Sequence, residues 1–260
     1  MNITIFGAAG WVGRAVVETL QHDHTLTAFD LNAESWEKWD DLHVAMGYGS
    51  KVYGDISDAA AVDAAVAGSD AILHAAVFFS QFGNPDADMA FRVNVQGLWH
   101  VLESARRHEV RRFVHVGSCH VQNPRGVFNS GEVRRPDWSL YNVTKRLQEE
   151  MCRHFHDDTG AGTIVLRPDY IVDCRTGINM FRTFLIDGPC DPWPQWICRW
   201  DLAQAVRLAL TVPDLGCEIL HVANDPGAAE HCNVERTREV LGWNPVEDFS
   251  QYIDEANDRR

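Results

Sequence analysis

The chain has 260 residues, 45% of them hydrophobic, which suffices for one main core and a small additional lobe. Its formal net charge of −14 disfavours nucleic acid and anionic membranes as partners. No apolar run approaches the ~20 residues of a membrane span, and the first residues already form a strand-like run that leaves no room for a signal peptide, so we expect a soluble, cytoplasmic protein.

Apolar runs alternate with amphipathic stretches along the first two thirds of the chain. The runs predict strands near residues 2–6, 25–30, 49–53, 70–75, 112–117 and 162–167. The stretches between them predict helices near residues 11–21, 58–67, 86–108 and 139–158. After an irregular tract over 173–199 come a predicted helix near 201–211 and a strand near 218–223. Nearly continuous apolar strands that alternate with helices are typical of a doubly wound parallel sheet.

The first predicted strand leads into Gly7-Ala8-Ala9-Gly10-Trp11-Val12-Gly13, a glycine-rich turn before a helix. Gly7 allows the tight turn, Gly10 lets the backbone of the turn approach a pyrophosphate, and Gly13 permits close packing of helix on sheet. The helix N-terminus would then face the anion. A plain turn between strand and helix would also use glycines. We interpret the turn as a dinucleotide site that includes Trp11 and Val12.

Asp30 ends the second predicted strand. Its carboxylate can accept hydrogen bonds from both ribose hydroxyls of an adenosine, and it would repel a 2′-phosphate. The next residues, Leu31 and Asn32, are neutral, and no Lys or Arg follows before Lys38. The sequence therefore predicts NAD rather than NADP, with Asp30 and Leu31 at the adenosine.

Three residues with catalytic chemistry follow the fifth predicted strand. Ser118 comes directly after it, while Tyr141 and Lys145 lie four residues apart in a predicted helix and so share one face. Tyrosine ordinarily has a pKa near ~10, and a nearby ammonium lowers it. An ionised Tyr141 could act as a general base, with Ser118 holding the substrate oxygen and Lys145 also reaching a cofactor hydroxyl. Such Tyr–Lys pairs are common on solvated helices, so this pair depends on its context.

These residues resemble the extended short-chain dehydrogenase/reductase family, also called the NAD-dependent epimerase/dehydratase family. Further landmarks follow in the family's order along nearly the whole chain: Asp55-Ile56, His74-Ala75-Ala76, Asn94-Val95-Gln96-Gly97, Leu166-Arg167-Pro168, Trp200-Asp201-Leu202-Ala203 and Leu241-Gly242-Trp243-Asn244-Pro245. The resemblance implies a single Rossmann-type domain over 1–260 with a small C-terminal substrate lobe formed from 168–200 and 223–260. It also implies that Asp55, Ile56, His74, Ala75, Ala76, Asn94 and Arg167 belong to the cofactor site.

The short tract over 173–199 looks too small to enclose a nucleotide sugar. Together with Arg135-Pro136-Asp137 and the Ser-x-His after strand five, it resembles the uronate dehydrogenases and related sugar dehydrogenases. The implied function is oxidation by NAD of a hydroxyl, at the anomeric carbon, of a free sugar, sugar acid or sugar phosphate, with Tyr141 as base. Gly117 and Cys119 depart from that group, which tends to carry Ser and Asn there.

The substrate would contact residues at the ends of the strands and in the irregular tract. We expect these to be Ser118, Cys119, His120 and Tyr141, with Arg175 and Arg182 as candidates for clamping a carboxylate or phosphate. His120 and both arginines are equally well explained as surface residues.

Two other functions remain open. A nucleotide-sugar epimerase or dehydratase would hold NAD tightly and release no NADH; a dehydratase usually has a Glu near the Tyr, and Glu132 is the only Glu between 118 and 145. A non-catalytic NAD-sensing protein is the other alternative, which the intact Ser118, Tyr141 and Lys145 disfavour.

Metal binding and disulfides are not expected. The seven cysteines are scattered without Cys-x-x-Cys spacing, and His154-Phe155-His156 lies in a predicted helix where residues two apart do not face each other. The family resemblance implies a homodimer through helices 86–108 and 139–158. Trp99, Val101 and Leu102 would then be interface residues, although core packing explains them equally well.

Overall fold

The centre of the fold is a seven-stranded parallel sheet with the strand order β10-β6-β5-β4-β1-β2-β3. The structure is a computed structural model, and it describes residues 1–38, 49–79, 86–121, 139–184, 196–225, 227–250 and 252. The strands of this sheet are β1 (Asn2–Phe6), β2 (Thr25–Asp30), β3 (Ser50–Tyr53), β4 (Ala71–His74), β5 (Arg112–Val116), β6 (Gly162–Pro168) and β10 (Cys217–Val222). All neighbouring strands pair in parallel, which confirms the predicted doubly wound sheet.

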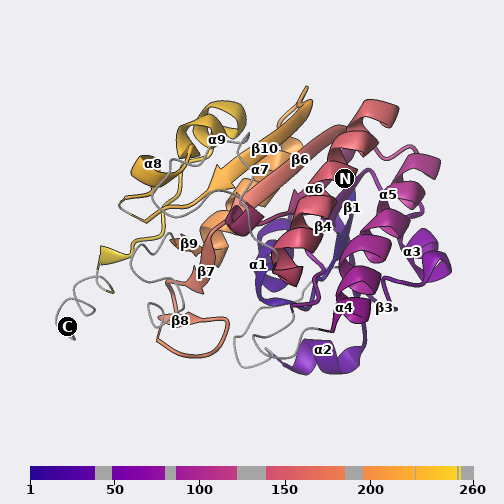
Figure 1. Cartoon of the computed structure of the whole chain (residues 1–260), viewed down its shortest axis with the longest axis horizontal. Helices are drawn as coiled ribbons and strands as arrows, with labels where there is room; N and C mark the ends of the chain where they lie inside the picture. Colours follow the sequence, from indigo (N-terminus) through magenta and orange to yellow (C-terminus); the bar gives the residue numbers. More distant parts are fainter. Residues whose placement is uncertain are drawn as a thin grey trace.

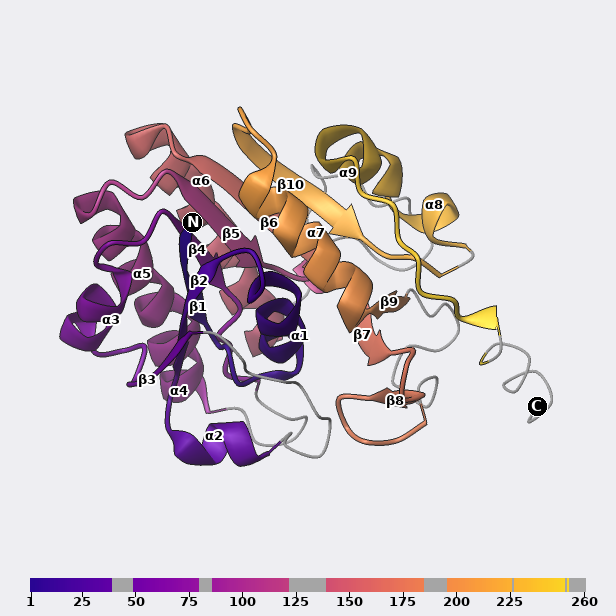
Figure 2. The ribbon, with the colours of Figure 1, turned by 180° about the vertical axis from the view of Figure 1, so that it is seen from behind.

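Helices cover both faces of the sheet. Figure 1 looks onto α3 (Ala59–Val66), α5 (Gly97–Arg107) and α6 (Leu140–Thr159), while Figure 2 looks onto α1 (Trp11–Leu20) and α7 (Arg199–Thr211). Residues of a strand alternate between two cores: Ile5 packs with the α1 and α7 side, and Phe6 packs with the α3, α5 and α6 side. The sheet is therefore buried on both faces, as its continuous apolar strands predict.

The shorter elements connect and cap this framework. They are α2 (Ala33–Glu37), α4 (Ala87–Ala90), the π-helix η2 (Phe91–Gln96), the 3-10 turn η3 (Cys119–Val121), α8 (Ala228–His231) and α9 (Val234–Leu241). The helix predicted over 86–108 is thus three consecutive elements, with a wider turn in the middle. No helix in the described part of the chain is long and apolar enough to span a membrane.

A second, three-stranded sheet begins directly after the carboxyl end of β6. It consists of β7 (Tyr170–Asp173), β8 (Ile178–Asn179) and β9 (Trp196–Cys198), in the order β8-β7-β9. β8 and β9 lie in the irregular tract over 173–199, and β7 ends at the first residue of that tract, where no strand is predicted from the sequence. In Figure 2 they lie beyond the first turn of α7, at the end of the molecule where the large sheet finishes.

Candidate functional site

The glycine-rich turn between β1 and α1 packs directly against the segment that follows β4. Gly7 has a φ of +84°, and a Cβ on it would lie 2.6 Å from the backbone nitrogen of Ala76. A Cβ on Gly13 would overlap the carbonyl oxygen of Gly7 and lie 2.7 Å from the Cα of Ala8. Because β2 pairs with one side of β1 and β4 with the other, the turn lies where the strand order reverses. Open α/β sheets bind dinucleotides at this point.

The first turn of α1 is suited to an anion. Gly10 is its extended N-cap residue, no side chain caps the helix, and the first turn contains no acidic residue. A Cβ on Gly10 would meet only the Gly7 carbonyl oxygen, at 3.2 Å, so the space above this residue is open. The positive end of the helix dipole, with the backbone of Trp11, Val12 and Gly13, therefore faces a place that fits a pyrophosphate.

Asp30 lies at the end of β2 beside this turn. Its Oδ2 accepts a hydrogen bond from the Ala9 backbone nitrogen at 2.8 Å, and its Oδ1 accepts one from that of Leu31 at 2.8 Å. The two bonds fix the carboxylate and leave each oxygen with capacity for a ribose hydroxyl. The nearest basic residue in the turn, Arg14, is buried and donates to the carbonyls of Ala9 and Trp36, away from the ribose position. This arrangement fits NAD and gives a 2′-phosphate no partner among these residues.

Residues after β3 and β4 form the wall of the site. Asp55 accepts hydrogen bonds on Oδ1 from the backbone and hydroxyl of Ser57, both at 2.8 Å. Ile56 packs so closely on α5 that a Cβ on Gly97 would lie 2.7 Å from its Cγ2. The Ala75 backbone nitrogen donates to the carbonyl of Phe6 at 2.8 Å, which extends the pairing of β4 with β1 past His74.

Asn94 lies in the π-helix η2, and its side chain is completely buried. Its Oδ1 accepts from the Phe78 backbone nitrogen at 2.7 Å, and its Nδ2 donates to the Phe78 carbonyl at 3.1 Å and to the Thr144 hydroxyl at 3.1 Å. These contacts join the segment after β4 to α6. They support a positioning role for Asn94, and its expected cofactor contact stays a prediction.

The structure brings Ser118, Tyr141 and Lys145 together. Ser118 is only 4% exposed and hydrogen-bonds to the hydroxyl of Tyr141. The Lys145 Nζ lies 5.9 Å from the centre of the Tyr141 ring and donates to the carbonyl of Val116 at 2.9 Å. The ring of Phe79 packs edge-on against Tyr141, with 5.1 Å between the ring centres. The three predicted catalytic residues thus form one cluster at the carboxyl end of β5.

The ionisation of Tyr141 differs from the prediction. Burial raises the pKa of its phenol to about 12, although the hydrogen bond with Ser118 acts in the opposite direction. Burial also lowers the pKa of Lys145 to about 8, against the effect of the Glu149 carboxylate. In the chain alone the effect of burial on the Tyr141 pKa outweighs any lowering by the Lys145 ammonium, which donates to the carbonyl of Val116.

Two buried histidines lie under the same cluster. His74 and His115 have their Nδ1 atoms 3.1 Å apart, and neither ring is exposed. Burial lowers the pKa of His74 to about 3 and that of His115 well below its ordinary value, and the charge of Lys145 adds to both effects. The pair is therefore neutral, with one Nδ1 as donor and the other as acceptor.

Arg167 forms a buried ion pair beneath α6. Its guanidinium makes two hydrogen bonds of 2.7 Å with the carboxylate of Glu149, from Nε to Oε1 and from Nη2 to Oε2. The cofactor contact expected of Arg167 stays a prediction.

Neither arginine proposed as a substrate clamp is available as a single free charge. Arg175 pairs with Glu247, with its Nη2 2.9 Å from Oε1, and stacks on the Trp200 ring at 4.0 Å. Arg182 donates from Nη2 to the Lys38 carbonyl at 2.6 Å. Both guanidinium groups thus have structural partners.

The other expected substrate contacts lie in or near the 3-10 turn after Ser118. Cys119 is partly exposed, and its charge when ionised would raise the pKa of Tyr141, so the two side chains are close. The side chain of His120 lies outside the described part of the structure, as do Glu132 and Arg135-Pro136-Asp137. The described residues contain no cluster of three or more His, Cys, Asp or Glu suited to a metal ion.

One feature near the site has no counterpart in the sequence predictions. The guanidinium of Arg199 lies between the rings of Trp11, at 4.5 Å, and Trp200, at 4.8 Å. Its Nε donates to Asp173 Oδ2 at 2.6 Å, and the indole nitrogen of Trp200 donates to Asp173 Oδ1 at 3.2 Å. This stack connects the glycine-rich turn to the second sheet. The only sequence signal for it is the landmark Trp200-Asp201, which lies next to Arg199.

Comparison with known proteins agrees with this geometry. The model of the NAD dependent epimerase/dehydratase family matches residues 3–172. A uronate dehydrogenase of Pseudomonas syringae pv. tomato is 28% identical over 236 residues, which cover 86% of this chain and 74% of the relative. An L-arabinose 1-dehydrogenase (NAD(P)(+)) of Haloferax volcanii is 22% identical over 97% of this chain and 99% of the relative.

A solved structure has the same overall fold. The crystal structure of uronate dehydrogenase from Agrobacterium tumefaciens superposes with a TM-score of 0.74 and 25% identity, over 98% of this chain and 88% of that one. The family match extends from β1 to β7 and so includes the glycine-rich turn, Ser118, Tyr141 and Lys145. The resemblance inferred from the sequence is confirmed: the chain belongs to the NAD-dependent epimerase/dehydratase family, and its cofactor is NAD.

Proposed function

We propose that the protein is an NAD-dependent dehydrogenase that oxidises the anomeric hydroxyl of a free sugar or sugar acid to a lactone. The observation that carries this proposal is the hydrogen bond between Ser118 and Tyr141, with Lys145 one helical turn further on, at the sheet edge next to the glycine-rich turn. The relatives named as uronate dehydrogenases and as an L-arabinose dehydrogenase support the substrate class.

Each residue of the cluster has one task in this reaction. Ser118 holds the substrate hydroxyl, and Tyr141 as phenolate takes its proton while the C–H electron pair leaves the same carbon as hydride. Oxidised NAD supplies the positively charged nicotinamide ring that accepts this hydride. The products are the lactone, NADH and a proton. Phe79 packs against Tyr141 and helps to keep water from the phenol.

Tyr141 needs positive charge nearby to act as a base at neutral pH, because burial raises its pKa to about 12. Lys145 supplies the protein's share of that charge from a distance of 5.9 Å to the ring. Its ammonium is fixed by the carbonyl of Val116 and so remains next to the reacting groups. Lys145 therefore acts as the cation of the site, and its charge is needed for turnover.

The substrate would lie between this cluster and the small lobe formed by residues 168–200 and 223–260. The described parts of that lobe are the second sheet with β7, β8 and β9, the helices α8 and α9, and the segment after them. Two features support this placement: β7 continues directly from β6, and ligands of such sheets bind beyond the carboxyl ends of the strands.

The test is a panel of free aldoses, uronic acids and sugar phosphates with NAD, read as NADH formation. A dehydrogenase forms NADH in proportion to substrate, whereas an epimerase or dehydratase consumes substrate without net NADH. Tyr141→Phe should reduce turnover by at least about a thousandfold, the upper range of acid–base catalysis, with NAD affinity retained. Tyr53→Phe removes the same group from an exposed position and should leave turnover unchanged. Near-normal turnover in Tyr141→Phe would remove Tyr141 from the mechanism.

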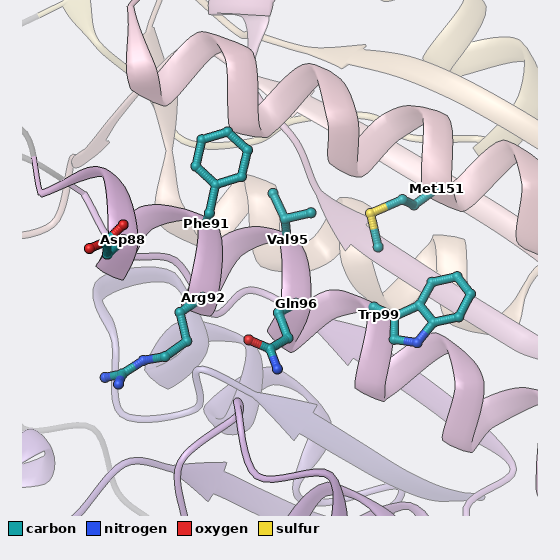
Figure 3. A pocket seen from close by; sticks show the side chains of 7 residues that line it. All are labelled: Asp88, Phe91, Arg92, Val95, Gln96, Trp99 and Met151. Atoms are coloured by element: carbon teal, nitrogen blue, oxygen red, sulfur yellow. The ribbon is translucent and has the colours of Figure 1, made fainter.

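We also propose that two copies of the chain pair through α5 and α6. Figure 3 shows Phe91, Val95 and Trp99 on one helix facing Met151 of its neighbour around a shallow groove. Phe91 is 42% and Trp99 58% exposed, an unusual state for such large apolar side chains. Val101 and Leu102 are buried in the core, so their predicted interface role is wrong.

The pairing is tested by the molar mass in solution. Light scattering coupled to size exclusion should give the mass of a dimer for the natural chain and of a monomer for Trp99→Asp, which buries a charge in the apolar contact. A control with Val246→Asp, which is exposed elsewhere, should keep the dimer. A natural chain that elutes as a monomer at micromolar concentration would contradict the proposal.

A further inference from the structure

A row of ionisable side chains runs along one face of α6 beneath the candidate site. Tyr141, Lys145 and Glu149 follow one another at intervals of four residues, so they share a face of the helix. Lys145 is 3% exposed and Glu149 is 1% exposed. A buried ammonium and a buried carboxylate, one turn apart, therefore lie in a medium where charges interact strongly.

Glu149 is fixed in this row by Arg167 of β6. The two side chains form parallel hydrogen bonds of 2.7 Å, the bidentate geometry in which a guanidinium holds a carboxylate most rigidly. Arg146 lies three residues before Glu149 on α6, and its Nη1 is 3.5 Å from Glu149 Oε2, a weaker contact. The position of the Glu149 charge is thus set by the sheet and not by the helix alone.

The end of β5 accommodates both members of the row. Val116 accepts the hydrogen bond from Lys145 Nζ, and the next residue is Gly117. A Cβ on Gly117 would lie 3.4 Å from Glu149 Oε1 and 2.9 Å from Val165 Cγ1. The glycine at this position leaves room for the carboxylate beside the backbone that binds Lys145.

The other ionisable groups around Lys145 cannot serve as its counterion. His74 and His115 have lowered pKa values, and Tyr141 and Cys152 have raised ones, so all four are neutral near pH 7. Arg167 has the same sign as the ammonium. Among the described residues, the ionisable groups that interact with Lys145 are His74 of β4, His115 of β5, and Tyr141, Glu149 and Cys152 of α6.

We propose that Glu149 is the counterion that keeps Lys145 protonated in the site, and that Arg167 limits this effect because it pairs with the same carboxylate. Both are positioning residues: they act on the reaction through Lys145 and touch neither substrate nor cofactor. The inference rests on the proposed function for its effect on turnover, since it is the charge of Lys145 that the reaction uses. Its effect on the ionisation of Lys145 does not depend on any activity.

The titration of Lys145 can be measured directly because the chain contains only three lysines, Lys38, Lys51 and Lys145. Protein labelled with ¹³C-lysine gives three Cε signals by NMR, and the signal that is lost in Lys145→Arg belongs to Lys145. The unmodified protein should show this group titrating far below the ordinary ~10.4 of lysine. The measurement uses the full chain and needs neither NAD nor a sugar.

Two substitutions should shift this titration in opposite directions. Glu149→Gln removes the counterion, so the acid dissociation constant of Lys145 should rise about tenfold, one unit of pKa. Arg167→Gln removes a like charge and frees Glu149 to act on Lys145 alone, so the constant should fall. Glu149→Asp keeps the charge and should stay closer to the natural chain. Glu150→Gln makes the same chemical change at an exposed neighbour and should have no effect.

An unchanged Lys145 titration in a folded Glu149→Gln variant would overturn the proposal, and so would shifts of the same sign in Glu149→Gln and Arg167→Gln. Glu149→Gln could fail to fold because it leaves the buried Arg167 unpaired. In that case the double variant Glu149→Gln/Arg167→Gln is measured, since it removes both charges of the pair. Its Lys145 constant should still rise, since the charge of Glu149 raises the pKa of Lys145 in the natural chain.

Enzyme kinetics supply the second reading. The alkaline side of the pH profile of NADH formation should move to lower pH in Glu149→Gln, because Lys145 loses its proton earlier. If no sugar is oxidised by the natural chain, the proposed function fails while the NMR titration still decides the role of Glu149.

Discussion

A methyl group added at Gly13 or at Gly10 of the glycine-rich turn should affect folding stability and NAD binding to different degrees. In Gly13→Ala the new Cβ would overlap the Gly7 carbonyl and lie 2.7 Å and 2.8 Å from the Cα and carbonyl carbon of Ala8, all of them backbone atoms. Since ordinary contacts begin near ~3.5 Å, the turn must move by roughly 1 Å. We expect a loss of about 1–3 kcal/mol in the free energy of unfolding, typical of overpacking. The displaced N–H groups should also weaken NAD binding at least about tenfold.

Gly10→Ala is the informative partner of this variant. Its Cβ meets only the Gly7 carbonyl oxygen, at 3.2 Å, and its backbone is in an extended conformation that alanine adopts without strain. Stability should therefore fall by about 1 kcal/mol or less, since alanine is a poorer N-cap residue than glycine and its contact with the Gly7 carbonyl is tight. NAD binding should still fall, because the methyl group projects into the space assigned to the pyrophosphate.

Urea unfolding and isothermal titration with NAD measure the two quantities. Gly216→Ala, whose Cβ would meet nothing closer than 4.0 Å, serves as the control for both. Gly13→Ala with unchanged stability would refute the packing argument. Gly10→Ala with unchanged NAD affinity would place the pyrophosphate elsewhere.

Three further predictions follow from the site. Asp30→Ala should reduce the preference for NAD over NADP, measured as the ratio of the two dissociation constants; an unchanged ratio would mean that Asp30 does not face the ribose. Burial lowers the pKa of His74 from 6.5 to about 3, so below pH 6.5 the unfolded chain binds a proton that the folded chain does not, and stability falls as the pH drops toward 3. His74→Asn should remove up to about 1.4 kcal/mol of that loss per pH unit in urea unfolding, and an equally steep curve would contradict it. Arg175→Gln should leave the KM for a sugar acid within about twofold, because Glu247 already pairs with Arg175; a large rise would restore Arg175 as a clamp.

The large sheet could be predicted from the sequence because its strands are apolar on both faces. The predicted strands at 2–6 and 25–30 coincide with β1 and β2, and the ends of the others agree within one residue. The second sheet could not be predicted, since β8 has two residues and β9 three, too few for any periodicity. Its stability comes from contacts distant in sequence, such as Asp173 with Arg199.

The sequence predicts which residues meet in the candidate site, but it does not predict their pKa values. The spacing of Tyr141 and Lys145 correctly places them on one face, but spacing does not reveal burial, which reverses the expected shift of the Tyr141 pKa. The partner of Arg167 could not be predicted for a similar reason. Its landmark fixes its position on β6, whereas Glu149 belongs to another element. The interval of four residues from Lys145 to Glu149 is the sequence signal that places Glu149 on the same face of α6.

The alternating stack of Trp11, Arg199, Trp200 and Arg175 has a consequence for protein engineering. It joins the first and the last third of the chain through side chains that stack face to face. A chimera that receives its C-terminal portion from another family member would leave the Trp11 indole against a foreign surface. Domain grafting in this scaffold therefore requires that residues 11 and 199 be exchanged together.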